Sequence, residues 1–180
     1  MSLIPSVRSS ASHALQYLSG FLFGEPKRPL WRYCLIAFPL ALLPSLAILS
    51  SIVLTSRAIG VDISRLMRPA ISATWSDFFG SVVFAPIVET LVLALLLRIL
   101  SALTPRKILV VSASALLWGC LHASLGVLAF FGTAWSFFVF SFTFLVWRKK
   151  SFLDAFIAAA APHALVNFTA IICIAIADSA

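Results

Sequence analysis

Residues 85–97 read APIVETLVLALLL, and this apolar run with a single carboxylate, Glu89, decides the fold class. The whole chain has the same character, because 62% of its 180 residues are hydrophobic and only 11% are charged. Soluble domains are about 45–50% apolar and about 25% charged. We therefore predict an integral membrane protein of the all-α class. An acidic side chain in lipid costs from about 3 kcal/mol upward, so we expect Glu89 to face other helices and to serve a function.

Five apolar runs approach the length of about 20 helical residues that crosses a bilayer core. The stretch 108–147 contains no Asp, Glu, Lys or Arg and is long enough for two crossings. We expect one membrane-embedded domain over residues 31–180, a polytopic bundle of about five spans, and an N-terminal cytoplasmic or interfacial segment over residues 1–30. The spans are expected to start near Tyr33, Phe78, Ile108, Ala129 and Phe156.

The formal net charge of +7 comes from short basic clusters between the apolar runs. Such clusters are typical of headgroup anchors and topology signals, and no basic face with interleaved aromatic residues indicates a nucleic-acid partner. Alternating spans divide the basic residues nine to three, which predicts a cytoplasmic N-terminus. The cytoplasmic set is Lys27, Arg28, Arg32, Arg98, Arg106, Lys107, Arg148, Lys149 and Lys150, and the opposite set is Arg57, Arg65 and Arg68.

Four polar side chains are costly inside these runs: Glu89, His122, His163 and Asn167. Counted from the nearest basic residues of the cytoplasmic set, the first three lie at depths of roughly 14, 22 and 20 Å. His163 and Asn167 are four residues apart and therefore share one helical face. A lone histidine or asparagine in a membrane helix is often only a strut between helices. The combination of a carboxylate, two imidazoles and an amide at matched depth favours a functional site.

Two further patterns predict how the helices pack. Pro86 and Pro162 each stand just before one of these polar residues, and each should remove a backbone hydrogen bond. Ala115, Gly119 and Ala123 form a stripe of small residues that allows a neighbouring helix to approach closely. We expect a tight bundle around a small wet cavity.

The segments APIVETLVLALLLRIL, WGCLH and HALVN resemble the three motifs of the CPBP family of intramembrane proteases, also called the Abi or CAAX-protease family. The family pattern is E-E-x-x-x-R, then F-x-x-x-H, then H-x-x-x-N or H-x-x-x-D. Glu89 matches the first glutamate. His122 matches the second motif, with Trp118 in place of phenylalanine, and His163 and Asn167 match the third.

Two positions depart from the family pattern. Thr90 stands in place of the second glutamate, and Ala94 stands in place of the arginine. Loss of both members of a buried ion pair leaves no orphan charge, whereas loss of one leaves a costly ion. The double replacement is therefore coherent with a working core and indicates a divergent, compact bacterial member.

The resemblance implies an endopeptidase that cleaves near the C-terminal tail of a membrane-anchored protein or sorting-signal substrate, in a bacterial inner membrane and without a cofactor. Glu89, the only carboxylate in the set, is the expected base that activates water. His122 is expected to share and orient that water, and His163 with Asn167 to donate to the oxyanion.

Two alternatives stay open at this point. Glu89, His122 and His163 also form a plausible catalytic zinc ligand set, although the sequence has no H-E-x-x-H motif. A non-catalytic role is the other alternative, such as a bacteriocin-immunity protein or another membrane partner. A proton-coupled carrier is less favoured, because five spans without inverted repeats are few for a carrier.

Overall fold

The structure is a computed structural model that describes residues 29–67 and 74–178. Within these ranges every regular element is a helix, which confirms the predicted all-α class. The predicted N-terminal segment lies almost entirely outside the described residues. The elements are α2 (Leu30–Ala58), the short 3-10 helix η1 (Ser64–Leu66), α3 (Trp75–Phe78), the π-helix η2 (Phe79–Phe84), α4 (Ala85–Leu103), α5 (Lys107–Ala123), α6 (Ala129–Trp147) and α7 (Phe152–Asp178).

Four helices are long and apolar enough to cross a membrane, so the chain is a membrane protein. They are α2, the continuous helix Trp75–Leu103 that joins α3, η2 and α4, then α6, and Phe152–Ile176 within α7. The fifth expected span is α5, whose 17 residues rise only about 26 Å. The last helix begins at Phe152, before the expected Phe156, because the Ser151 hydroxyl accepts a hydrogen bond from the backbone N–H of Asp154.

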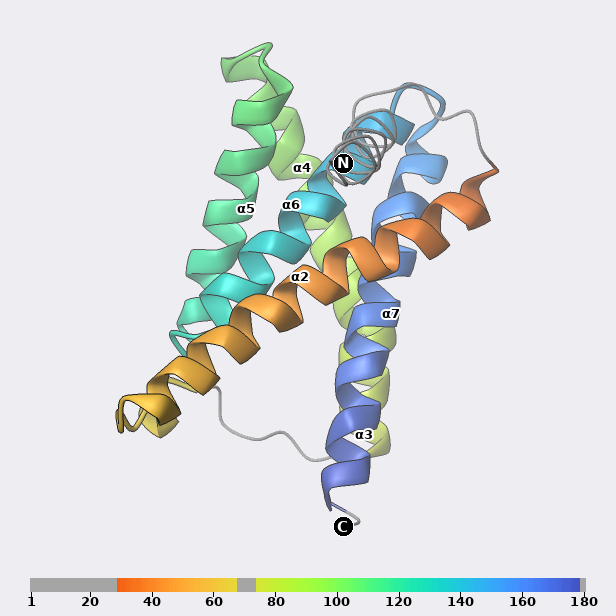
Figure 1. Cartoon of the computed structure of the whole chain (residues 1–180). Helices are drawn as coiled ribbons and strands as arrows, with labels where there is room; N and C mark the ends of the chain where they lie inside the picture. Colours follow the sequence, from red (N-terminus) through yellow and green to blue (C-terminus); the bar gives the residue numbers. More distant parts are fainter. Residues whose placement is uncertain (1–28, 68–73, 179–180) are drawn as a thin grey trace, which may run out of the picture.

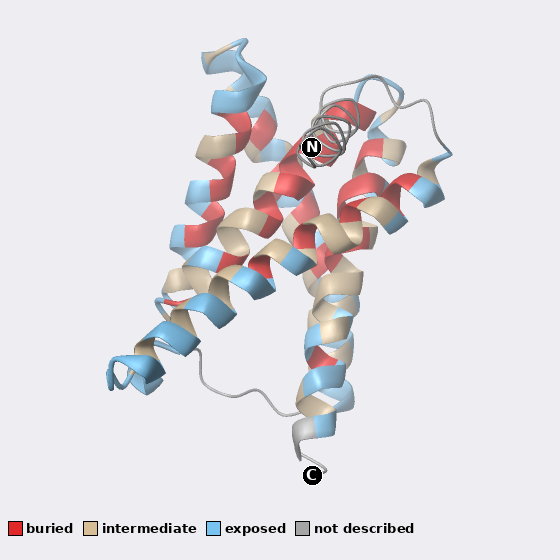
Figure 2. Ribbon diagram, in the orientation of Figure 1, coloured by how far each residue is buried: buried red, intermediate tan, exposed pale blue. Residues whose placement is uncertain are grey.

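Helix α6 is the centre of the bundle, with α2, α5 and α7 packed around it (Figure 1). In α6, 56% of an 18-residue stretch is buried, against 17%, 22% and 33% of such stretches in the other three long helices. The buried positions accordingly gather around α6, whereas the outer faces of the surrounding helices are exposed (Figure 2). These outer faces are apolar, as expected for helices whose outer surface contacts lipid rather than water.

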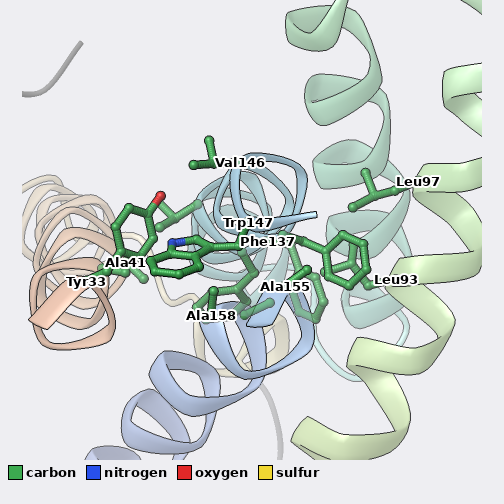
Figure 3. Close-up of a cluster of buried hydrophobic side chains, with 14 of the residues drawn as sticks. Tyr33, Ala41, Leu93, Leu97, Phe137, Val146, Trp147, Ala155 and Ala158 are labelled. Carbon is green, nitrogen blue, oxygen red and sulfur yellow. The ribbon is translucent and has the colours of Figure 1, made fainter. Parts of the chain in front are cut away.

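The core is built from aromatic side chains of α6 and smaller side chains of its neighbours (Figure 3). Trp147 makes an edge-to-face contact with Tyr33 of α2, with ring centroids 5.4 Å apart. Phe137, Leu93 and Ala158 belong to the same buried cluster. The cluster therefore connects α2, α4, α6 and α7 and holds these four helices in one arrangement.

The predicted stripe of small residues on α5 faces α6. A Cβ placed on Gly119 would lie 3.0 Å from the Cβ of Ala134 and 3.0 Å from the ring of Phe130. A larger residue would require Ala134 and Phe130 of α6 to shift by a few tenths of an ångström. The close helix contact predicted from the stripe is therefore confirmed at Gly119.

At two prolines of the bundle, Pro44 and Pro86, a side chain of another helix binds the backbone carbonyl that the proline leaves free. Pro44 of α2 has no N–H to donate to the carbonyl oxygen of Leu40, four residues earlier. The indole Nε1 of Trp135 on α6 donates to that oxygen at 2.9 Å. A carbonyl that is not satisfied within its own helix is costly in lipid, so this bond ties α2 to α6 at a defined position.

Candidate functional site

Glu89 lies in the second turn of α4, immediately after a change in helix type. The π-helix η2 ends where the N–H of Ala85 donates to the carbonyl oxygen of Gly80. The next bond in this register would run from residue 86 to Ser81, but Pro86 has no N–H. Single turns of π-helix inside α-helices are frequent at functional sites. Pro86 therefore leaves the carbonyl of Ser81, eight residues before Glu89, without a backbone donor.

Asn167 of α7 satisfies this carbonyl. Its side-chain Nδ2 donates to the oxygen of Ser81 at 2.8 Å. Oxyanion donation beside His163 stays a prediction for Asn167, because this bond to the backbone before Glu89 uses only one hydrogen of its amide. The bond fixes α7 against the segment that carries the carboxylate, and one of the two amide hydrogens remains available.

The structure brings Glu89, His122 and His163 together from α4, α5 and α7. The Oε2 atom of Glu89 lies 3.9 Å from Nε2 of His122 and 3.8 Å from Nε2 of His163. The convergence expected from matched depth is thus confirmed for these three residues. Both distances exceed that of a direct hydrogen bond and suit a water molecule between the groups.

The hydrogen bond of the other ring nitrogen defines the tautomer of His122. Its Nδ1 lies 3.0 Å from the carbonyl oxygen of Trp118, one turn earlier on α5. A carbonyl oxygen only accepts, so Nδ1 carries the hydrogen. In the neutral ring, Nε2 then presents a lone pair toward Glu89.

The surroundings of His163 differ from those of His122. Nδ1 of His163 is buried and has no hydrogen-bond partner among the residues that the structure describes. Its neutral ring can therefore carry the hydrogen on Nε2, the nitrogen that faces Glu89. The two imidazoles thus present different groups to one carboxylate, a lone pair from His122 and an N–H from His163.

Aromatic side chains of α6 form the wall behind both imidazoles. Phe140 stacks on the His163 ring at a centroid distance of 4.9 Å. Phe137 contacts the rings of His163 and His122 at 5.3 Å and 5.8 Å and stacks on Trp118 at 4.3 Å. Trp118, which the sequence pattern placed beside His122, contributes its carbonyl to the histidine and its indole to packing.

The site is accessible on one side only. The side chains of Glu89 and His122 keep 25% and 19% of their surface exposed, whereas His163 keeps 6%. A small molecule can therefore reach the carboxylate and one imidazole, while the other imidazole is packed at the rear of the site.

The positions that depart from the family pattern do not join this cluster of polar groups. Thr90 is buried, with 1% exposure, and Ala94 is half-buried one turn further along α4. A glutamate at position 90 would be a buried charge without an arginine at position 94. The pair of small residues avoids that cost.

Sequence reasoning missed Ser81, Phe137 and Phe140. Pro86 signals an unpaired carbonyl, but the α-helical register assigns it to Val82, and only the π-helix η2 moves it to Ser81. Phe137 and Phe140 lie in the uncharged stretch 108–147. The chain has sixteen phenylalanines, and no feature of the sequence distinguishes these two from the others.

The donor spacing is wider than that of a zinc site. Tetrahedral zinc with ligands at about 2.0–2.1 Å places neighbouring donor atoms about 3.3–3.4 Å apart. The measured separations from Glu89 to the two imidazoles are 3.9 Å and 3.8 Å. The alternative zinc set of Glu89, His122 and His163 does not fit without closure of the three side chains.

Comparisons with known proteins give no match: no protein-family model, no curated protein and no solved structure is significantly similar to this chain.

Proposed function

We propose that this membrane protein is a glutamate-type intramembrane endopeptidase, a divergent and compact bacterial member of the CPBP family. The proposal places it in a bacterial inner membrane with a cytoplasmic N-terminus. Its substrate is a membrane-associated protein cleaved near its C-terminal tail. The observation that carries the proposal is the position of the Glu89 carboxylate within 4 Å of two imidazole nitrogens from two other helices.

The first step assigned to this site is attack by water on the scissile carbonyl. Glu89 accepts a proton as the water oxygen forms its bond to the carbonyl carbon. The Nε2 lone pair of His122 accepts a hydrogen bond from the same water and so orients it. This assignment rests on the tautomer of His122, whose Nδ1 hydrogen is held by the Trp118 carbonyl.

The second group needed is a donor for the oxyanion that forms. The electron pair of the carbonyl moves to its oxygen, and the Nε2 hydrogen of His163 donates to that oxygen. The burial of His163 between Phe137 and Phe140 fixes its ring without a hydrogen bond at Nδ1. When the carbon–nitrogen bond breaks, the leaving amine receives the proton from Glu89.

Asn167 enters this proposal as a positioning residue. Its amide donates to the backbone carbonyl of Ser81, eight residues before Glu89, and thereby fixes the direction in which α4 continues from the π-helix η2. Small displacements of a base relative to its substrate reduce rates strongly. We therefore assign it to the orientation of Glu89 rather than to contact with the substrate.

The experiment compares membranes from three strains, in which the native gene encodes the wild-type protein, the Glu89→Gln variant or the Asp154→Asn variant. Asp154 is the matched control, because it is a half-buried carboxylate at the start of α7, nine residues and about 13.5 Å along the helix before His163. Mass spectrometry of membrane peptides identifies the C-terminal fragments that the wild type releases. We expect Glu89→Gln to reduce their release by a factor of 10² or more, and Asp154→Asn to change it less than twofold.

Folding and metal content complete the test. Glu89→Gln should insert and unfold like the wild type, which separates loss of chemistry from loss of structure. Unchanged release of fragments by Glu89→Gln would overturn the proposal and favour the non-catalytic role. Activity that disappears in chelator, together with one equivalent of bound zinc, would instead establish the metal mechanism.

A further inference from the structure

A second candidate binding site lies between α4 and the turn that connects α6 to α7. A cavity of about 560 Å³ opens there, away from the Glu89 cluster. Apolar side chains such as Leu91, Leu95 and Phe144 line one part of it, and two guanidinium groups, those of Arg98 and Arg148, line another. We call this feature the arginine pocket.

Within the part of the chain that the structure describes, neither arginine forms an ion pair with a carboxylate. Arg148 lies over the ring of Phe152, 5.8 Å from its centroid, so an aromatic face rather than a carboxylate orients it. The acidic residue of the described chain nearest in sequence to Arg148 is Asp154, which forms no ion pair with either arginine. Two unpaired guanidinium groups in one cavity favour an anion.

The position of the pocket distinguishes a lipid from a soluble anion. Arg148 follows the last residue of α6, and Arg98 lies five residues before the end of α4, about 7.5 Å along the helix. The apolar lining extends from the arginines toward the middle of α4, up to Leu91. The cationic part is thus at the depth of headgroups and the apolar part at the depth of acyl chains. Basic pockets between membrane helices bind anionic headgroups in this way.

We propose that the arginine pocket binds an anionic phospholipid. Its phosphate lies between Arg98 and Arg148, and one acyl chain lies along Leu91 and Leu95. Arginine suits this role, because its planar guanidinium donates two parallel hydrogen bonds to phosphate oxygens while its apolar stem packs against hydrocarbon. This site is separate from the proposed peptidase chemistry and does not depend on it.

The experiment measures lipid binding to the purified full chain by native mass spectrometry in a neutral detergent. The probes are phosphatidylglycerol, phosphatidylcholine and inorganic phosphate, each added over a concentration series. We expect the wild type to bind phosphatidylglycerol at least tenfold more tightly than phosphatidylcholine. The double variant Arg98→Gln with Arg148→Gln should lose tenfold or more of this affinity, because it removes the charge-assisted bonds to phosphate.

The matched control removes the same charge at the same end of the bundle. Arg106→Gln with Lys107→Gln changes the basic pair between α4 and α5, which is exposed and outside the pocket. We expect this control to keep the wild-type affinity within twofold. Ala94→Leu adds bulk to the pocket wall without changing charge, and it should weaken phosphatidylglycerol binding while retaining both arginines.

Three results would overturn the proposal. Equal loss in the control pair would indicate diffuse attraction to the basic end. Competition by inorganic phosphate at the same concentration would indicate a free-phosphate site. Equal affinity for the two phospholipids would show that no anionic lipid is selected. If the double arginine variant fails to fold, unchanged binding by Ala94→Leu overturns the proposal and weakened binding supports it.

Discussion

Replacing Asn167 by alanine removes the amide that donates to the carbonyl oxygen of Ser81. The resulting loss in the free energy of unfolding should depend on whether residue 86 is proline. In the wild type that oxygen has no backbone donor at residue 86, so loss of the amide leaves it unsatisfied. In a Pro86→Ala background the new N–H restores a complete backbone ladder across η2 and α4. The same substitution should then cost much less.

The magnitude follows from the type of bond. An unsatisfied buried acceptor costs about 1–3 kcal/mol, and hydrogen bonds between membrane helices average about 0.6 kcal/mol with a maximum near 1.7. Asn167 and Ser81 are half-buried, so we expect a coupling of about 1 kcal/mol between positions 86 and 167. That value corresponds to about a fivefold change in the unfolding equilibrium. Packing lost on truncation of Asn167 is common to both backgrounds and cancels in the cycle.

The assay is reversible unfolding in mixed micelles, followed by circular dichroism for the wild type, both single variants and the double variant. Thr169→Val is the control, because the Thr169 hydroxyl donates to the carbonyl of Leu165 within α7 and to no other helix that the structure describes. Its cost should be the same with proline or alanine at position 86. A coupling below about 0.3 kcal/mol between positions 86 and 167 would refute the reasoning that Asn167 replaces the missing N–H.

The remaining predictions concern the packing around α6. Trp135→Phe should lower the free energy of unfolding by about 1 kcal/mol, because it removes the hydrogen bond to the carbonyl of Leu40. In a Pro44→Ala background the same substitution should cost much less in the same unfolding assay, and equal costs in the two backgrounds would contradict this prediction. Gly119→Ala should destabilise the bundle by about 1–3 kcal/mol despite the gain in helix propensity, whereas Gly80→Ala, with open space around it, should be neutral or stabilising. Equal effects of the two glycine variants would contradict the close approach of α5 to α6.

The two proline positions show the same physical arrangement at different places in the fold. Pro44 frees the Leu40 carbonyl and Trp135 binds it, while Pro86 frees the Ser81 carbonyl and Asn167 binds it. Lipid offers no donor to such an oxygen, so the donor must come from another helix. In the first case the bond connects α2 to α6, and in the second it connects α7 to the helix that carries Glu89.

The amino-acid sequence by itself determined the class of the protein and the identity of the converging groups. Long apolar runs can satisfy their backbone in lipid only as helices, and a carboxylate or imidazole within them is too costly to face hydrocarbon. These two constraints act on each run separately, so they can be read without knowledge of its neighbours. They identified Glu89, His122 and His163. In the structure, Nε2 of each histidine lies within 4 Å of Oε2 of Glu89.

Only the tertiary structure decided how these groups are supported and oriented. The hydrogen on Nδ1 of His122, the burial of His163 against Phe140 and the bond from Asn167 to Ser81 all depend on which helix faces which. The presence of Arg98 and Arg148 in one pocket, the arginine pocket, depends on it as well. Apolar packing is nondirectional, and the phenylalanines of α6 lie on several of its sides, so the sequence does not specify which phenylalanine contacts which partner. Helix rotation and register decide those contacts, and they result from the packing of the whole bundle.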